Sequence, residues 1–374
     1  MFNNQLNKNN IDKKINKIKY KHRILNNLLD YKYNFKEILR NQCSQYNSLK
    51  KFVLPKVSRI IVIGDIHGDW DRLIKLFNIA KLIDKDNNWI GGNTVVVQVG
   101  DQIDRCRSNN LDCHMKGVTI PDEGNDWKIL QYFTNLHNQA IKVGGAVYSL
   151  LGNHELMNVQ QNLNYVSYEG FNEFNNFKTS NGNIIKDGHE ARQWAFQKGN
   201  DISIFLACTR NVALIIGSNL FVHAGILDKI AEKYDINNIN KLMTLYLLNK
   251  LKNIDNYQDL FDANTISPLW NRVFGKLALI SKNYNINNYN PYLNKICNKL
   301  MLPLNKIYNI DKIYVGHTPI IDHGISNVCN NKIWITDYGM SKAFDKFKYP
   351  NKMKIQVLEI LNDGAEINIL EESL

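Results

Sequence analysis

Long apolar runs and a secretory leader are the first features that this sequence lacks. Its best candidate for a membrane span, residues 211–227, is interrupted by Gly217 and His223 and falls short of the roughly 18 apolar residues that cross a bilayer. The first 22 residues place no apolar block behind their charges. We therefore expect no transmembrane segment and no secretory signal.

Cysteine is scarce, and its spacing does not fit the paired pattern of zinc sites. Six cysteines are scattered over 374 residues, which favours free thiols in a reducing compartment over a disulfide framework. We therefore expect unpaired cysteines and a cytoplasmic location. The six positions are Cys43, Cys106, Cys113, Cys208, Cys297 and Cys329.

Acidic residues are scarce only at the start of the chain. Residues 1–56 carry 13 Lys and Arg against 3 Asp and Glu, whereas residues 57–374 carry 33 against 32. The net charge of +11 therefore belongs to the leading segment, and nucleic-acid binding by the rest is not expected. We interpret residues 1–56 as a basic, Asn- and Lys-rich arm with one or two amphipathic helices between positions 16 and 39. It is either solvated and partly disordered or docked on an acidic partner or an anionic surface.

No fixed-period repeat and no linker rich in Gly, Ser or Pro divides residues 57–374, which predicts one domain after the arm. This part alternates short β-rich runs with polar loops and helical stretches, the pattern of an α/β sheet flanked by helices. Apolar residues at helical spacing predict covering helices within residues 69–83 and 126–141. The first helix would bury one face made by Leu73, Leu76, Phe77, Ala80 and Ile83.

Side chains of the kinds that bind metals follow five of the predicted strands. Because the carboxyl ends of strands in an α/β sheet aim several loops at one point, we expect these side chains to meet. Carboxylate, imidazole and amide oxygen suit iron, manganese or zinc, and the central Asp101 can bridge two ions. The five sets are Asp65 and His67 after RIIVIG; Asp101, Asp104 and Arg105 after NTVVVQVG; Asn153, His154 and Glu155 after AVYSLLG; His223 after NLFV; and His317 after KIYVG.

These residues belong to five short motifs in a fixed order: GDIHG (64–68), GDQIDR (100–105), GNHE (152–155), HAG (223–225) and GHTP (316–319). Together the motifs resemble the signature of the calcineurin-like metallophosphoesterase superfamily, and Arg105 and Glu155 resemble the phosphoprotein phosphatase family within it. LLGNHELMN, PLWNR and DYGMSKAF are similar to landmarks of its bacterial-type, Shewanella-like branch. The SAPNY segment of the eukaryotic Ser/Thr enzymes is missing. The resemblance extends over about residues 58–344.

The resemblance implies an α/β fold in which a metallophosphoesterase-type central β-sandwich is flanked by helices, with a dimetal site at the strand ends. Two divalent ions, Mn, Fe or Zn, would occupy that site. Asp65, His67 and Asp101 would hold the first ion. The second would be held by Asp101, Asn153, His223 and His317.

The resemblance also implies the remaining roles in the site. His154 and Asp104 would form a proton-donating pair, while Arg105, Arg272 of PLWNR and Asn153 would bind the substrate. The implied enzyme is a hydrolase of phosphomonoesters on Ser or Thr, with Tyr left open, in which a metal-bridging hydroxide attacks in line. Its partner would be a phosphoprotein or phosphopeptide. A phosphodiesterase or dinucleoside polyphosphate hydrolase of the same superfamily is the alternative, and a non-catalytic binding module is disfavoured because no metal ligand is missing.

The second motif departs from the family pattern at Cys106, where members usually have glycine. Since glycine permits backbone conformations that cysteine disfavours, we expect a different local turn. Cys106, Cys113 and His114 remain open as a redox switch, as a further metal site or as ordinary loop residues, because thiol reactivity depends on exposure and pKa.

Overall fold

The computed structural model of the chain divides into two units, residues 1–49 and 50–374. It describes residues 35–46, 51–108, 110–263, 266–283, 290–321, 323–347 and 354–373. In the first unit, residues 35–43 are helical and lead into the 3-10 turn η1 (Ser44–Tyr46). Most of the basic arm, with most of the span expected to form amphipathic helices, lies outside the described residues.

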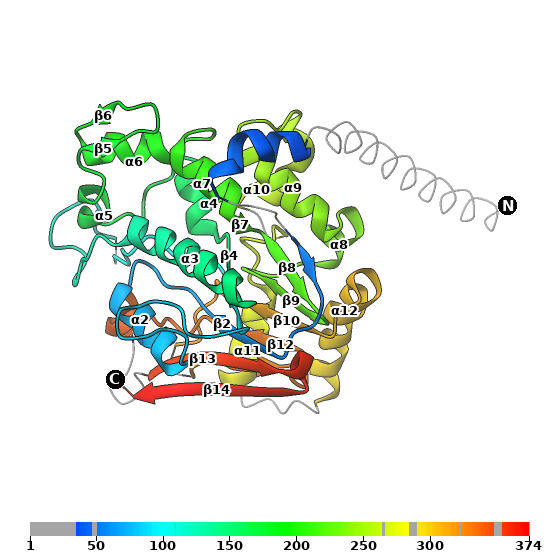
Figure 1. The fold of residues 1–374 in the computed structure, drawn as a ribbon. Coiled ribbons are helices and arrows are strands. Elements are labelled where there is room, and N and C mark those ends of the chain that lie inside the picture. The colour runs from blue at the N-terminus through cyan, green and yellow to red at the C-terminus, as the bar shows by residue number, and fades with distance from the viewer. Residues whose placement is uncertain are drawn as a thin grey trace. The chain divides into compact units, whose positions relative to one another are not determined.

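One six-stranded sheet contains the strands that precede the first three motifs (Figure 1). In its central strands β2 and β3, every Val and Ile is buried, as expected for β-branched residues in a sheet covered on both faces. β2, β3 and β4 are parallel, so their carboxyl ends lie at the same edge. In spatial order the strands are β14 (Glu366–Ser373), β13 (Lys354–Leu361), β2 (Arg59–Ile63), β3 (Val95–Gln98), β4 (Ala146–Leu150) and β7 (Arg210–Asn211).

A second six-stranded sheet contains the strands that precede the last two motifs. β9 and β10 are parallel, with Leu220 opposite Ile313, so their carboxyl ends also share one edge. In spatial order the strands are β1 (Val53–Leu54), β8 (Ala213–Ile216), β9 (Asn219–Val222), β10 (Lys312–Val315), β12 (Ile333–Ile335) and β11 (Ser326–Val328). A separate hairpin pairs β5 (Phe177–Lys178) with β6 (Ile184–Ile185).

The hydrophobic core lies between the two sheets. Val62 and Val97 of the first sheet belong to the same buried cluster as Phe221 and Tyr314 of the second. The rings of Phe221 and Tyr314 stack with centroids 4.9 Å apart. The two sheets therefore form a β-sandwich, whose facing side chains make one apolar layer.

The two predicted covering helices are present and lie on the first sheet (Figure 1). α2 (Trp70–Ile79) begins where the Asp69 side chain accepts the Arg72 backbone N–H, and it buries Leu73, Leu76 and Phe77. It ends before the predicted boundary because Lys81 has a left-handed φ of 57°. Ile83 consequently lies beyond the helix. The second covering helix is α3 (Asp126–Ala140).

The remaining helices surround the sandwich. Four of them, α4 to α7, lie in the connection between β4 and β7. They are α4 (Asn153–Val159), α5 (Tyr168–Asn172), α6 (Gly188–Phe196), α7 (Asp201–Thr209), α8 (Asp228–Lys233), α9 (Ile236–Leu247), α10 (Gln258–Phe261), α11 (Val273–Asn283) and α12 (Pro291–Tyr308). Short 3-10 turns are η2 (Ile141–Val143), η3 (Ile254–Tyr257), η4 (Lys342–Phe347) and η6 (Asn362–Gly364).

The expectation of free cysteines is wrong. Cys106 is bonded to Cys113 and Cys297 to Cys329, with Cα atoms 5.8 and 5.4 Å apart, and no described cysteine is a free thiol. The second pair could not be predicted from cysteine spacing, because its two residues are 32 positions apart in the chain. The expectation of a cytoplasmic location rested on free cysteines, so these bonds remove its support. Disulfides persist mainly in oxidising compartments. Within the described ranges, no helix has both the length and the apolar character to cross a membrane.

Candidate metal centre

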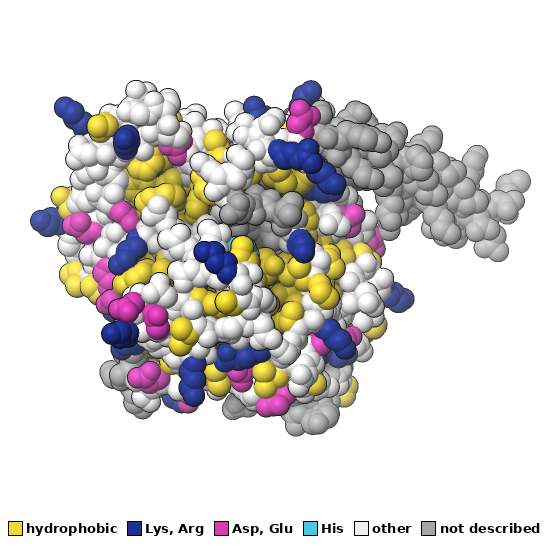
Figure 2. Space-filling view, in the orientation of Figure 1, with side chains coloured by type: hydrophobic (Ala, Val, Ile, Leu, Met, Phe, Trp, Pro, Cys, Tyr) yellow, Lys and Arg dark blue, Asp and Glu magenta, His cyan; other side chains and the backbone are white. Residues whose placement is uncertain are grey.

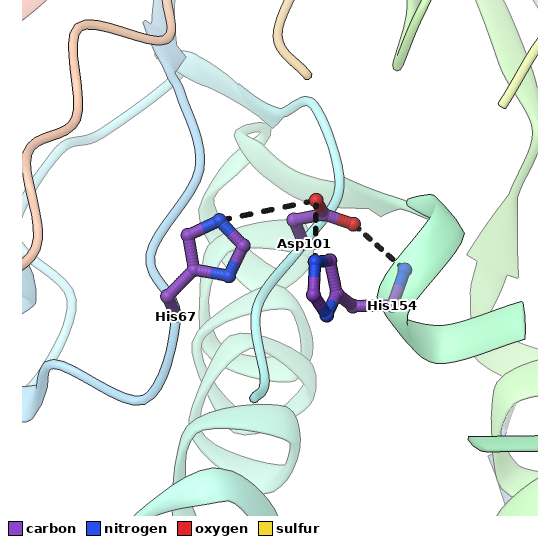
Figure 3. Close-up of side chains that lie close together, drawn as sticks. All are labelled: His67, Asp101 and His154. Atoms are coloured by element: carbon purple, nitrogen blue, oxygen red, sulfur yellow. Dashed lines mark hydrogen bonds and ion pairs between the residues drawn. The ribbon is translucent and has the colours of Figure 1, made fainter. Parts of the chain in front are cut away.

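The five loops predicted to converge do so at the carboxyl ends of β2, β3, β4, β9 and β10. Two buried groups of ligand-type side chains lie there, and within each group the ligand atoms are within 4.8 Å of one another. Asp101 belongs to both groups, as a bridging carboxylate would. Figure 3 shows His67 and His154 on either side of its carboxylate. The groups are His67, Asp101 and His154, and Asp101, His223 and His317.

The backbone of the centre is strained where the side chains must turn inward. His67, Asp101, Asp104 and His317 have φ values of 47°, 54°, 70° and 67°. Such left-handed conformations are uncommon outside glycine and gather at functional sites. Gly152 is required by close approach, because a Cβ there would collide with the Asp101 side chain and backbone nitrogen. The motif glycine therefore lets the β4 loop reach the shared carboxylate.

Asp65 joins the first motif to the last. Its carboxylate accepts the His317 backbone N–H at 3.1 and 3.3 Å, although 252 positions separate the two residues. Its Oδ2 lies 3.9 Å from Nε2 of His67. Burial raises the pKa of Asp65 well above its usual value, and the nearby Asp337 and Asp101 carboxylates raise it further. A divalent cation would relieve this repulsion between buried acids.

Hydrogen bonds to the backbone orient the histidines. A carbonyl oxygen can only accept, so Nδ1 of His67 donates to Ile103 at 3.1 Å and Nδ1 of His223 donates to Val99 at 2.9 Å. Their Nε2 atoms therefore face the centre, where that of His67 contacts Arg107 and that of His223 contacts Asn153. His317 is held the other way round, with Nε2 donating to the Trp270 carbonyl at 3.1 Å. Such contacts to the second ring nitrogen fix the tautomer of metal-binding histidines.

Acceptor atoms face one another around His223. Its Nε2 lies 2.9 Å from Oδ1 of Asn153 and 3.3 Å from Oδ1 of Asp101, while its Nδ1 already donates to Val99. Neither oxygen carries a hydrogen to share, so only a proton or a metal cation between them makes this arrangement favourable. Nitrogen, amide oxygen and carboxylate are the donors that iron, manganese and zinc take. The residues thus fit a divalent ion.

Burial and neighbouring charges together set the pKa values of the ligand residues. Burial opposes ionisation of Asp101, but His223 and His154 outweigh it and hold its pKa well below the usual range. Burial lowers the pKa of His67 and of His317 well below the usual value, and the adjacent Arg107 and His223, respectively, lower each further. Both rings are therefore neutral near pH 7, the state in which imidazole binds a metal.

Glu155 ties the second and third motifs together. Its carboxylate accepts backbone N–H groups from Gly152 at 2.6 Å, Asp101 at 3.0 Å and Gln102 at 2.7 Å. Burial and the nearby Asp101 carboxylate raise its pKa to about 7. The sequence marked Glu155 as an acidic residue at a strand end and as part of a family motif. The structure shows that it fixes the loop that carries the shared carboxylate.

His154 is backed by a buried chain of charges. Its Nδ1 lies 2.8 Å from Oδ2 of Asp104, and the other oxygen of Asp104 lies 3.1 Å from Arg192. Arg192 is fully buried and also pairs with Asp126 at 2.9 Å. Asn158 adds an amide donor to Asp104 at 3.0 Å. Sequence reasoning missed Arg192 and Asp126, because neither belongs to a motif and no local pattern connects α6 to this carboxylate.

The expected phosphate-binding arginines differ in their surroundings. Arg105 is bound to the protein, with ion pairs to Asp69 at 3.3 Å and Glu123 at 3.5 Å and a bond to Ser341. Arg272 lies beside His317, whose backbone carbonyl accepts from its Nη1 at 2.5 Å. His154 belongs to the ligand group of His67, whereas Arg272 contacts the ligand group of His317. The ion pairs of Arg105 within the described residues are to Asp69 and Glu123, which belong to neither group.

An arginine that no motif marked lies at the centre. Nη2 of Arg107 is 2.8 Å from both ring nitrogens of His67 and 3.4 Å from Nε2 of His154. The neighbouring His114 belongs to no group of three metal-binding side chains in the described part of the chain, and its Nε2 bonds to the Leu163 carbonyl. The structure therefore gives no support to a further metal site at Cys106, Cys113 and His114.

Comparison with known proteins agrees with this architecture. The model of the calcineurin-like phosphoesterase family matches residues 58–320. An uncharacterised protein of Acanthamoeba polyphaga mimivirus is 38% identical over 252 residues, which cover 62% of this chain and 95% of that protein. Shewanella-like protein phosphatase 2 of Arabidopsis thaliana is 28% identical over 330 residues, covering 80% of this chain and 76% of that protein.

A solved structure has the same fold. The crystal structure of a cold-active protein-tyrosine phosphatase from a psychrophilic Shewanella species aligns with a TM-score of 0.59 and 20% identity, covering 87% of this chain and 84% of that one. At this identity the likeness concerns the fold alone. Together with the two packed sheets, it confirms the predicted α/β fold with a central β-sandwich.

Proposed function

This chain belongs to the calcineurin-like phosphoesterase family, and from that premise we propose that it is a metal-dependent phosphoprotein phosphatase acting on phosphomonoesters of Ser, Thr or Tyr. The observation that carries the proposal is the pair of buried ligand groups sharing Asp101, with the His154–Asp104 pair beside them. Likeness over most of the chain to a Shewanella-like protein phosphatase supports a phosphoprotein substrate.

The ligand set fits two divalent cations. Asp65, His67 and Asp101 would hold the first, and Asp101, Asn153, His223 and His317 the second. When bound, such ions supply positive charge and activate water for attack on phosphorus. Mn, Fe and Zn are the metals that the mixture of imidazole, carboxylate and amide oxygen favours.

His154 would give the leaving oxygen its proton. Because Nδ1 donates to Asp104, a proton on Nε2 points toward the centre, where Nε2 lies 3.8 Å from Oδ2 of Asp101. The same nitrogen cannot hold a proton and a metal together, so His154 acts here as the acid and Asp65 completes the first ligand set. Proton transfer of this kind contributes typically ~10² to 10⁴ in rate.

Arg272 would neutralise the phosphate from the His317 side, since a guanidinium fork pairs with two phosphate oxygens. Arg105 can share this task only by giving up contacts with Asp69 or Glu123. On the face drawn in Figure 2, Lys and Arg are interspersed with Asp and Glu rather than gathered in one stripe. On that face, the described residues therefore form no continuous basic track for nucleic acid.

The proposal is tested by offering the purified, Mn²⁺-loaded protein matched phosphoserine, phosphothreonine and phosphotyrosine peptides, single-stranded DNA and diadenosine tetraphosphate. We expect phosphate release from at least one peptide and little cleavage of the other two substrates. Cleavage of DNA or of the dinucleotide, with every peptide untouched, would replace the proposal by the phosphodiesterase or polyphosphate hydrolase alternative.

A further inference from the structure

We propose that Lys342 is a positioning residue for phosphate binding: it neutralises the carboxylate of Glu123 and so leaves Arg105 free to bind the substrate phosphate. This inference rests on the proposed phosphatase function, in which Arg105 is one of the residues that bind phosphate. It accounts for how an arginine that is buried and paired within the protein can also serve a substrate. Lys342 lies at the start of η4, outside the five motifs.

One carboxylate oxygen is shared by the two cations. Oε1 of Glu123 lies 2.7 Å from Nζ of Lys342 and 3.5 Å from Nη2 of Arg105. The first distance is typical of a charge-assisted hydrogen bond, whereas the second is long for one. Because the attraction between opposite charges weakens with distance, Lys342 is the principal partner of Glu123 and Arg105 is the weaker one.

Asp69, the other acid beside Arg105, has further partners of its own. Its Oδ2 accepts the Lys342 backbone N–H at 2.7 Å, and its Oδ1 accepts the Arg72 backbone N–H at 3.1 Å. Nη1 of Arg105 lies farther from Oδ2, at 3.3 Å. Nζ of Lys342 also lies 3.9 Å from Oδ1. The buried Asp69 carboxylate therefore keeps two hydrogen bonds and a nearby positive charge if Arg105 turns away.

The remaining contacts of Arg105 are also long. Its Nε donates to the Pro121 carbonyl at 3.3 Å and its Nη1 to the Ser341 hydroxyl at 3.2 Å. That hydroxyl donates to the His67 carbonyl at 3.3 Å, which places Arg105 next to the first motif. Two oxygens of a phosphate dianion can replace these contacts with shorter, charge-assisted ones.

Lys342 removes the usual obstacle to such a movement. A buried carboxylate that loses its cation is strongly destabilising, so a buried arginine is normally fixed by its acids. Here the lysine stays behind, because Asp71 holds its Nζ at 2.7 Å from the exposed side. Partial burial opposes the charge of Lys342, but hydrogen bonds to Asp71 and Glu123 outweigh it and raise its pKa above the usual value. The lysine is therefore charged at neutral pH.

The test measures orthophosphate binding by calorimetry on the Mn²⁺-loaded protein, together with peptide kinetics. In Lys342→Gln, Arg105 is left to neutralise Glu123, so phosphate must compete with that carboxylate. The Kd for orthophosphate and the KM for a phosphopeptide should rise roughly 5- to 20-fold. Lys342→Arg keeps the cation and should stay within about threefold. Lys75→Gln, at an exposed lysine of α2, is the matched control and should bind as the unaltered protein does.

A second substitution distinguishes this role from a merely structural one. Glu123→Gln removes the carboxylate for which Arg105 would otherwise be retained. Added to Lys342→Gln, it should restore orthophosphate binding to within about threefold of the unaltered protein. If Lys342 only stabilised the fold, the double variant would bind no better than the single one. Glu123→Gln alone should bind orthophosphate at least as tightly as the unaltered protein.

The inference is overturned if Lys342→Gln binds orthophosphate as tightly as the unaltered protein, or if Glu123→Gln does not restore the binding that Lys342→Gln loses. Failure of the proposed function gives a different result. In that case the unaltered protein turns over no phosphopeptide, while its orthophosphate binding, which needs no turnover, still depends on Lys342 and Glu123 as described.

Discussion

Two parts of the metal centre are held in place by different means. We call the strand-end residues Asp65, His67, Asp101, His223 and His317 the floor, and Asp104, Arg107, Asp126, Arg192 and the Cys106–Cys113 loop the wall. In the floor, sheet geometry and backbone contacts such as His223 to Val99 and His317 to Trp270 fix each side chain. In the wall, buried ion pairs, aromatic contacts and a disulfide do so.

This difference predicts which substitutions change catalytic activity without changing the stability of the fold. In the floor, burial and the nearby Asp337 and Asp101 carboxylates raise the pKa of Asp65, so these crowded acids contribute little to folding without a cation. In the wall, Arg192 neutralises Asp104 and Asp126. Substitutions in the floor should therefore remove activity and spare the fold, whereas substitutions in the wall should lower both.

The largest effect on activity is expected from Asp101→Asn. The substitution removes the carboxylate common to both ligand groups, so phosphatase activity should fall by about 10³-fold or more. In the presence of a chelator, the variant loses the favourable contacts of the Asp101 charge with His223 and His154 but is relieved of its repulsion from Asp65 and Glu155. Its free energy of unfolding should therefore change less than that of Arg192→Leu. Asp86→Asn, at an exposed loop position, is the control. Unchanged activity in Asp101→Asn would remove the bridging assignment.

The largest effect on stability is expected from Arg192→Leu. Asp104 and Asp126 would be left buried without their cation, a loss of about 3–5 kcal/mol in the free energy of unfolding. Urea denaturation measures it. The matched control is Arg59→Leu, which breaks a half-exposed ion pair to Glu359 and should cost about 1 kcal/mol or less. Equal losses in the two variants would contradict the description of the wall.

The Cys106–Cys113 and Cys297–Cys329 disulfides separate stability from substrate binding. Loop-closure entropy predicts losses of about 2 kcal/mol for Cys106→Ser with Cys113→Ser and about 4 kcal/mol for Cys297→Ser with Cys329→Ser. Only the first pair adjoins Arg105, so only the first double variant should also raise KM. Thermal unfolding and peptide kinetics on both variants measure this contrast, and a rise in KM for both would refute it.

The smallest effect is expected from removing residues 1–34. The two ligand groups are made of residues between His67 and His317, so turnover of a small aryl phosphate should stay within about twofold. Kinetics on the truncated and full chains are the measurement. A tenfold loss would show that the arm takes part in the reaction.

The floor could be predicted from the sequence because each of its residues comes shortly after a predicted strand. Short Val- and Ile-rich runs predicted β2, β3, β4, β9 and β10, and the polar residues after them met because parallel strands share an edge. The wall could not be predicted in this way. The Asp104–Arg192 pair spans 88 positions and depends on how α6 folds back, which leaves no periodic or motif signal.

Smaller differences have equally local causes. α2 ends at Ile79 because Lys81 adopts a left-handed conformation without the glycine that usually signals it. The cysteines form disulfides because folding brings together residues whose spacing resembles no known framework. Asp337, which raises the pKa of Asp65, follows β12 in the segment DYGMSKAF, whose composition alone does not mark a metal-binding acid.

The metal content of the purified chain tests the central claim most directly. After loading with Mn²⁺ and removal of excess metal by gel filtration, elemental analysis should find two ions per chain in the unaltered protein and fewer in His223→Ala and in His67→Ala. Two ions that persist in all three proteins, or a single ion in the unaltered chain, would contradict a pair of cations held across Asp101.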